Sequence, residues 1–283
     1  IKKIPDNVHQ KFSLNIDETI NYLDIHSYEN YYLPIPILLE QSKSLPIFTF
    51  NSDDDGIMRR GSMLFEYDNY YFPSLSTSGL LELSNSKKIE FNKNKNQLKI
   101  GDYNIPINQK GEVILNFYPD GFKPYSISGV ISSWQHVLEG DLDKMVINPL
   151  DFKDSIVIVG ASAMGLHDLK TTPTAKLLPG SELHATIISN VLKGEVLKEV
   201  DSSIVWFLAV LTVIITTVLI VFVDNGIKYF LPFGAFFSYL WIVITLFKSK
   251  DMLLSIMGIM FPFVMTNLLS IIYVNLITQM KSV

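Results

Sequence analysis

Residues 202–223 have the sequence SSIVWFLAVLTVIITTVLIVFV, an apolar run of 22 residues without a charged side chain. Two similar uncharged runs follow, 19 residues from Tyr229 to Phe247 and 29 residues from Met252 to Met280. A helix needs about 20 apolar residues to cross the roughly 30 Å hydrocarbon layer of a bilayer. Buried helices of a large soluble protein are the alternative, but three consecutive runs of this length argue against it. We therefore predict a lipid bilayer as a partner and a three-helix transmembrane bundle at about 202–223, 229–247 and 252–280.

The composition of residues 1–200 indicates one water-soluble domain on one side of the membrane. Up to Asp201 the chain carries 19 Lys and Arg against 26 Asp and Glu. This acidic balance repels nucleic-acid phosphate, so we expect no nucleic-acid partner. The chain has no Cys, which removes thiolate metal sites and cysteine nucleophiles.

The charges beside the predicted spans bear on orientation. Lys228 lies alone in the turn after the first span, whereas Lys248 and Lys250 lie in the turn after the second. The positive-inside rule then places residues 1–200 in the cytoplasm, by a margin of one charge.

Turn signals divide residues 1–200 into short strands and helices, which predict an α/β domain with a mixed sheet and flanking helices. Leu45–Phe50 is a short β-rich run, and Met63–Phe72 predicts a hairpin with Asp68-Asn69 at its tip. Pro73-Ser74 begins a helix that continues through Leu83. The other expected elements are a second hairpin over 89–107, a strand over 112–117 and a helix over about 128–139 that ends at Gly140.

The stretch from residue 152 to 197 is the most informative part of this domain. Ser155–Val159 is a continuous β-branched run typical of a strand buried on both faces. A loop of small residues follows over 160–165, and a helix that begins at Pro179-Gly180-Ser181 ends at Gly194. Strand, small-residue loop and helix is the order in which α/β proteins build a pocket at the carboxyl edge of a sheet.

Two groups of motifs follow one another along the domain. The first is Asp53-x-Asp55-Gly56-x-x-Arg59-Arg60, then Tyr71-x-Pro73-Ser74-Leu75, then Gly111 with its strand. The second is Val159-Gly160-Ala161-Ser162, then Leu166-x-Asp168-x-x-x-Thr172-Pro173, then Pro179-Gly180-x-Glu182-x-His184-Ala185. Together with the triple apolar run, their order closely resembles a CHASE domain of the second type, a cyclases/histidine kinases associated sensory extracellular domain. The resemblance covers about residues 45–280.

This resemblance implies a location and a role. In that family the domain lies outside the cytoplasmic membrane of bacteria, and three transmembrane helices usually lead from it to an adenylate cyclase, histidine kinase or Ser/Thr kinase inside. The resemblance therefore implies a multi-pass protein of the bacterial inner membrane with residues 1–200 outside, and it overrules the one-charge orientation signal. Family members normally begin with a membrane helix and an α/β half-domain and end in an output domain. Since the chain begins at Ile1 rather than Met, we expect it to be a fragment or a processed product.

Candidate site residues cluster in and after the small-residue loop. The candidates for a ligand site or a structural loop are Gly160, Ser162, Gly165, His167, Asp168, Thr172, Pro173 and His184. Asp168 either contacts a ligand or a neighbouring subunit, or stabilises a turn by accepting from backbone N–H groups. His167, His184 and Asp168 would form a cation site only if the fold clustered them, so we predict no metal. The loop lacks the P-loop Lys and a complete dinucleotide Gly pattern, and no Gly-x-Ser-x-Gly surrounds Ser162, so we expect no cofactor and no catalytic residue.

Arg59 and Arg60 follow the acidic run Asp53–Asp55 across a tight turn. They form either a local charge pair, which contributes little at a surface, or a fork that binds an anion. Both interpretations remain open from the sequence.

No group of residues predicts catalysis, so the first hypothesis is an extracytoplasmic sensory input and membrane-anchoring module. The whole protein would then be a cyclase or kinase whose chemistry lies outside this segment. The alternative is a structural scaffold within a larger membrane assembly. We expect a homodimer, because small and hydroxyl residues in the apolar runs let helices approach closely. Other membrane or periplasmic proteins are further candidate partners.

Overall fold

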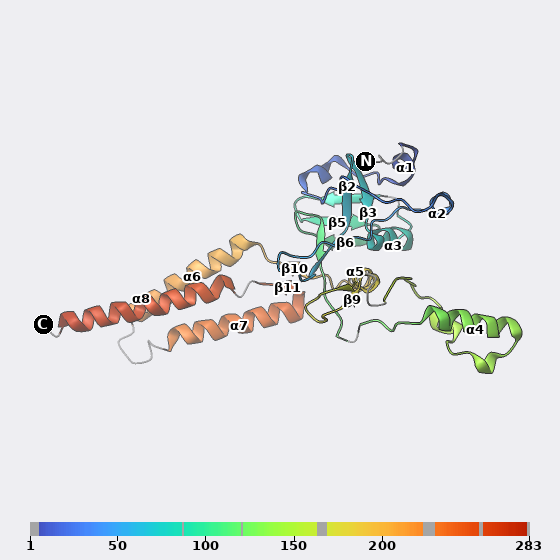
Figure 1. Ribbon diagram of the computed structural model, residues 1–283. Helices are drawn as coiled ribbons and strands as arrows, with labels where there is room; N and C mark the ends of the chain where they lie inside the picture. The colour runs from blue at the N-terminus through green and yellow to red at the C-terminus, as the bar shows by residue number, and fades with distance from the viewer. Residues whose placement is uncertain are drawn as a thin grey trace. The chain divides into compact units, whose positions relative to one another are not determined.

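The computed structural model describes residues 6–86, 88–119, 121–162, 169–222, 230–254 and 257–281. The chain divides into two compact units, the N-terminal unit (residues 1–196) and the C-terminal unit (residues 197–283). Figure 1 labels helices and strands of both units.

The N-terminal unit contains a tight antiparallel hairpin. It pairs β2 (Leu64–Tyr67) with β3 (Tyr70–Pro73). Asp68 and Asn69 at its tip have φ of 51° and 63°, the left-handed backbone of a two-residue hairpin turn that short polar side chains tolerate. The hairpin predicted from this dipeptide is confirmed.

A three-stranded antiparallel sheet replaces the predicted second hairpin. It consists of β4 (Ile89–Asn92), β5 (Gln97–Ile100) and β6 (Tyr103–Pro106) in that order. Side chains alternate between its faces, as the pleat requires, so one face is buried in the core. The buried side chains are Ile89, Phe91, Leu98, Ile100 and Ile105.

The helices α3 (Leu75–Leu83) and α5 (Gly180–Lys193) cover the core of this unit and are in contact with each other. Ser74 caps α3, because its hydroxyl accepts from the Thr77 N–H at 3.1 Å. Gly194 ends α5 with a left-handed φ of 72°. Both predicted helices are therefore confirmed.

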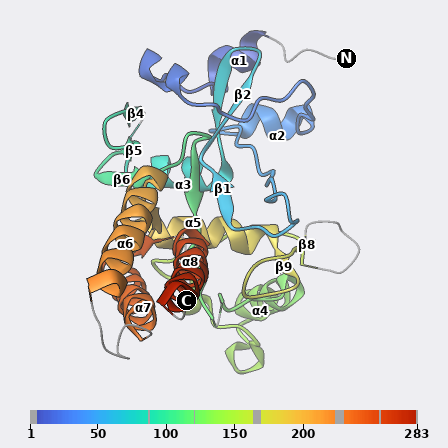
Figure 2. The ribbon, with the colours of Figure 1, turned by 90° about the vertical axis from the view of Figure 1, so that its left-hand side faces the viewer.

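A two-stranded antiparallel ladder packs closely on α5 (Figure 2). It pairs β1 (Arg60–Ser62) with β7 (Glu112–Ile114), which is shorter than the predicted strand over 112–117. A Cβ added at Gly61 would lie 2.5 Å from Ile187 Cδ1, so glycine permits this close approach. The shared core of strands and helices includes Met58, Met63, Leu64, Leu80, Val113, Leu183, Ile187 and Val191.

The remaining elements of the N-terminal unit are short except for α4 (Ile127–Glu139), which ends as predicted at Gly140 with a left-handed φ of 83°. They are α1 (Asp6–Phe12), η1 (Glu18–Tyr22), α2 (Pro36–Gln41), η2 (Leu142–Lys144), η3 (Pro149–Phe152) and the antiparallel pair β8 (Leu169–Lys170) and β9 (Leu178–Pro179).

Two predicted strands are not formed. Leu45–Phe50 contributes only an isolated bridge between Ile47 and Ser74. Ser155–Val159 belongs to no ladder among the described residues, and Ile156, Val157 and Val159 are 46%, 57% and 77% exposed instead of buried. As a result the described residues form several small sheets rather than one mixed sheet. A strand needs hydrogen-bond partners along its edges, and an apolar run does not by itself supply them.

Three long helices make up most of the C-terminal unit and pack against one another (Figure 1). They are α6 (Ser202–Phe222), α7 (Leu231–Lys250) and α8 (Met257–Lys281). The run that was expected to be helical from Met252 instead begins with β11 (Met252–Leu253), which pairs in parallel with β10 (Lys198–Glu199). Among the described residues one helical stretch, Ser202–Leu219, is long and apolar enough to cross a membrane by length and composition.

Candidate sensory pocket

A cavity of about 180 Å³ lies beside the N-terminal half of α5 in the N-terminal unit. Three segments form its wall: the chain after β7, the turn between β8 and β9, and the first two turns of α5. The lining residues are Phe117, Tyr118, Pro119, Gly121, Thr174, Ala175, Leu178, Glu182 and Thr186.

The side chain of Asn190 anchors the first of these segments to α5. Its Oδ1 accepts from the Asn116 N–H at 2.9 Å, and its Nδ2 donates to the Asn116 carbonyl at 3.0 Å. Asn190 is 1% exposed, so its amide replaces the strand partner that Asn116 would otherwise need. The segment is therefore fixed on α5 by a side chain rather than by a sheet.

The hydroxyl of Tyr118 lies in the same hydrogen-bond network. It accepts from Asn190 Nδ2 at 3.0 Å and from Ser189 Oγ at 3.1 Å, and it donates to Glu195 Oε2 at 2.9 Å. With one donor and two acceptor positions in use, the phenol is fully satisfied and its ring is held in place. Lys193 Nζ lies 4.4 Å from the centre of this ring, so one face of Tyr118 already carries a cation.

Thr172 stabilises the turn between β8 and β9, which is the second of the three segments that line the cavity. Its N–H donates to the Ala175 carbonyl at 2.8 Å, and its hydroxyl accepts from the Ala175 N–H at 3.0 Å. Thr172 is buried and Pro173 is exposed. These two residues, predicted as candidates from the sequence, therefore shape the turn that places Thr174 and Ala175 at the cavity.

Glu182 is the only Asp, Glu, Lys, Arg or His among the described lining residues. It lies in the first turn of α5, where a carboxylate is favoured by the positive end of the helix dipole. Its Oε1 accepts from the Phe122 N–H at 3.3 Å. Gly121 has a φ of 59°, and a Cβ added there would lie 2.4 Å from that oxygen, so the backbone approaches the carboxylate as only glycine allows.

His184, another predicted candidate, is a core residue and does not line the cavity. It is 3% exposed, with Ser76 Oγ 2.8 Å from Nδ1 and the Phe48 carbonyl oxygen 3.4 Å from Nε2. Burial lowers the pKa of this imidazole to about 4, which keeps the ring neutral near pH 7.

The other loop candidates divide between exposed and undescribed positions. Ser162 is exposed, and a Cβ at Gly160 would lie 2.4 Å from Ser181 Cβ, so the loop backbone lies directly on α5. Gly165, His167 and Asp168 lie outside the described residues.

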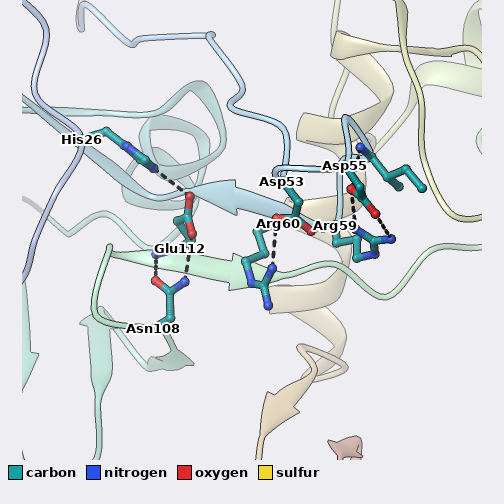
Figure 3. A network of polar contacts seen from close by, with 8 residues as sticks. His26, Asp53, Asp55, Arg59, Arg60, Asn108 and Glu112 are labelled. Atoms are coloured by element: carbon teal, nitrogen blue, oxygen red, sulfur yellow. Dashed lines mark hydrogen bonds and ion pairs between the residues drawn. The ribbon is translucent and has the colours of Figure 1, made fainter. Parts of the chain in front are cut away.

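Arg59 and Arg60 bind the carboxylates of their own turn (Figure 3). Arg59 makes two bonds to Asp55, of 3.0 and 2.8 Å, and one of 2.9 Å to Asp53 Oδ2. Arg60 donates to Asp53 Oδ1 at 2.9 Å. Hydrogen bonding to Arg59 is the main cause that lowers the pKa of Asp55 to about 2. This geometry corresponds to the local charge pairing, since an external anion would have to displace these carboxylates.

A second polar cluster in Figure 3 was not predicted from the sequence. Glu112 is 8% exposed; its Oε1 lies 2.8 Å from His26 Nε2, and its Oε2 accepts from Asn108 Nδ2 at 2.8 Å. Asn108 Oδ1 in turn accepts from the N–H groups of Lys110 and Glu112. The pairing of Glu112 with His26 joins residues 86 positions apart, which no local pattern could reveal.

Within the described part of the chain, one group of potential metal ligands comes together at the end of α4. His136, Glu139 and Asp141 bring one ligand atom each within 4.8 Å of one another. Both carboxylates are exposed, and Asp141 forms an ion pair with Lys144 at 2.7 Å. We therefore interpret these three side chains as part of the charged surface of the unit rather than as a metal site.

Taken together, the geometry defines a mixed α/β domain with a small polar pocket, followed along the chain by long apolar helices. The CHASE2 domain model matches residues 6–223, so the chain belongs to the CHASE2 family. CHASE2 is an extracellular sensory domain of signalling proteins. Neither the curated proteins nor the solved structures give a match to this chain.

Proposed function

We propose that this chain is the extracytoplasmic sensory input and membrane-anchoring part of a bacterial transmembrane signalling protein, and that it regulates a cytoplasmic adenylate cyclase or kinase domain. The observation that carries the proposal is the family match over residues 6–223, which extends from the N-terminal unit into the apolar helix α6. A sensory domain joined directly to such a helix can pass its state to the far side of a membrane, because irregular backbone cannot cross lipid unprotected.

The anchor in this proposal consists of three membrane spans, α6, α7 and α8. The helices have 21, 20 and 25 residues, and about 20 are needed to cross the hydrocarbon layer. Large apolar side chains on all three are exposed, among them Phe207, Trp241 and Leu269, which are 64–69% exposed. Lipid would cover such side chains in a membrane. The chain would act as a homodimer in the bacterial inner membrane, with paired helices shifting against each other to convey the signal.

Cysteine labelling tests this topology, because the chain has no Cys of its own. In intact cells a membrane-impermeant maleimide should label Asn94→Cys, in an exposed turn of the N-terminal unit, and Ser249→Cys, at the C-terminal end of α7. Asn225→Cys should react only after the membrane is opened.

The three positions separate the alternatives. If α6 were the only span, Ser249→Cys would be protected in intact cells together with Asn225→Cys. Labelling of Asn225→Cys but not Asn94→Cys in intact cells would reverse the orientation and contradict an extracytoplasmic sensor.

A further inference from the structure

We propose that the cavity beside α5 binds a small organic ammonium cation, with Glu182 as the counter-ion and the ring of Phe117 as an apolar wall. This inference rests on the proposed sensory function and assigns a ligand class to its pocket. The charge, the lining and the size of the cavity select this class of ligand.

The charge of the described lining selects a cation. Glu182 is its only acidic or basic side chain, and the other polar side chains, Thr174, Thr186 and Tyr118, are uncharged hydroxyls. The N-terminus of α5 would by itself favour an anion, but Glu182 occupies the first turn and supplies that negative charge from within the protein. The Glu182 carboxylate would repel an anionic ligand, whereas it would pair with a cation.

The rings select an organic cation over a simple metal ion. Phe117 and Tyr118 both line the cavity, and an aromatic face attracts an ammonium group, most strongly where water is excluded. Lys193 already covers one face of Tyr118, which shows that this ring accepts a cation and leaves Phe117 as the ring for a ligand. A metal ion would need more oxygen or nitrogen ligands than one carboxylate and neutral hydroxyls provide.

The volume limits the ligand to a small molecule. The cavity of about 180 Å³ is smaller than the roughly 300–1,000 Å³ of pockets for drug-sized ligands. Choline is therefore a suitable probe, since it combines a trimethylammonium group with a hydroxyl that the threonines can bond. Its neutral counterpart, 3,3-dimethylbutan-1-ol, has the same shape and lacks only the charge.

The experiment measures binding of both probes to the whole chain in lipid nanodiscs by isothermal titration calorimetry. Choline should bind at least tenfold more tightly than the neutral alcohol. Glu182→Gln should abolish this preference, and Glu182→Asp, which keeps the charge, should retain part of it. Phe117→Leu should weaken choline binding at least threefold. Glu90→Gln removes a carboxylate that is 66% exposed on β4 and should change nothing.

Each outcome bears on the proposal. Equal binding of the two probes, absence of choline binding, or an unchanged preference in Glu182→Gln would overturn it. If Glu182→Gln does not fold, choline binding to Phe117→Leu and Glu182→Asp tests the proposal instead, because both variants keep a carboxylate at position 182. A failure here leaves the labelling pattern of the topology experiment untouched, so the ligand class and the sensory role are tested separately.

Discussion

Acid should destabilise the N-terminal unit through His184, which the fold buries as a neutral ring. Because the Phe48 carbonyl can only accept, Nε2 of His184 carries the hydrogen and Nδ1 accepts from the Ser76 hydroxyl. A second proton would place a charge at a site that is 3% exposed. Burial accordingly lowers the pKa from its ordinary value of 6.5 to about 4.

The size of the effect follows from proton linkage. Above pH 6.5 the ring is neutral in the folded and the unfolded chain, so His184 adds no pH dependence there. Between pH 6.5 and about 4 the unfolded chain binds a proton that the folded chain excludes, and stability falls as the pH falls. The full loss of stability is roughly 3 kcal/mol, and about 2 kcal/mol of it should be reached by pH 5. Domains are commonly stable by only about 5–15 kcal/mol, so this loss is measurable.

The assay is pulse proteolysis of the whole chain in nanodiscs over a urea series at pH 7 and pH 5. His184→Gln keeps an amide that can bond Ser76 and Phe48 but does not titrate. The loss of stability from pH 7 to pH 5 should therefore be about 2 kcal/mol smaller in this variant than in the unaltered chain. Asn94→Ala, in an exposed turn and without a titratable group, serves as the control and should leave the loss unchanged. The reasoning is refuted if His184→Gln loses as much stability on acidification as the unaltered chain.

Two further substitutions test the wall of the pocket by the same urea assay at pH 7. Asn190→Ala leaves the N–H and carbonyl of the half-buried Asn116 without their partner and should cost about 2–4 kcal/mol. Asn94→Ala in an exposed turn should stay within about 0.5 kcal/mol, and equal costs would contradict the anchoring role. Gly121→Ala should cost about 1–2 kcal/mol from its left-handed backbone, plus the contact with Glu182. Gly56→Ala has a similar φ of 77° with open space around it, so a Gly121 variant no worse than this control would show that the close approach to Glu182 does not matter.

The features predicted correctly from the sequence are those set by neighbouring residues. Asp68-Asn69 tolerates the left-handed backbone of a two-residue turn, Ser74 accepts from a nearby N–H, and Gly140 and Gly194 end their helices in the left-handed region. Each of these effects acts over fewer than five residues. Local chemistry therefore predicts where the elements begin and end.

The pocket depends instead on contacts between distant residues. Asn190 bonds the backbone of a residue 74 positions away, and Thr172 shapes a turn whose neighbours across the cavity lie near residue 118. Thr172 and Pro173 were candidates because of their place in the family pattern; Glu182 lies in the same pattern but was not a candidate, and no sequence pattern indicates Asn190 or Tyr118 as site residues. An asparagine inside an amphipathic helix is indistinguishable in sequence from a solvent-facing one.

Residues 155–159 show where the interpretation of a hydrophobic pattern failed. The run is apolar on both faces, as in a strand covered by two layers. Ile158 packs against the core, and Gly160 lies against Ser181 of α5, but Ile156, which would share a face with Ile158 in a strand, is 46% exposed. Val157 and Val159 alternate with Ile158 and are exposed, so the described residues provide no layer over the other face. The prediction of a strand buried on both faces is therefore wrong, because a paired and buried strand requires neighbours that the run itself does not encode.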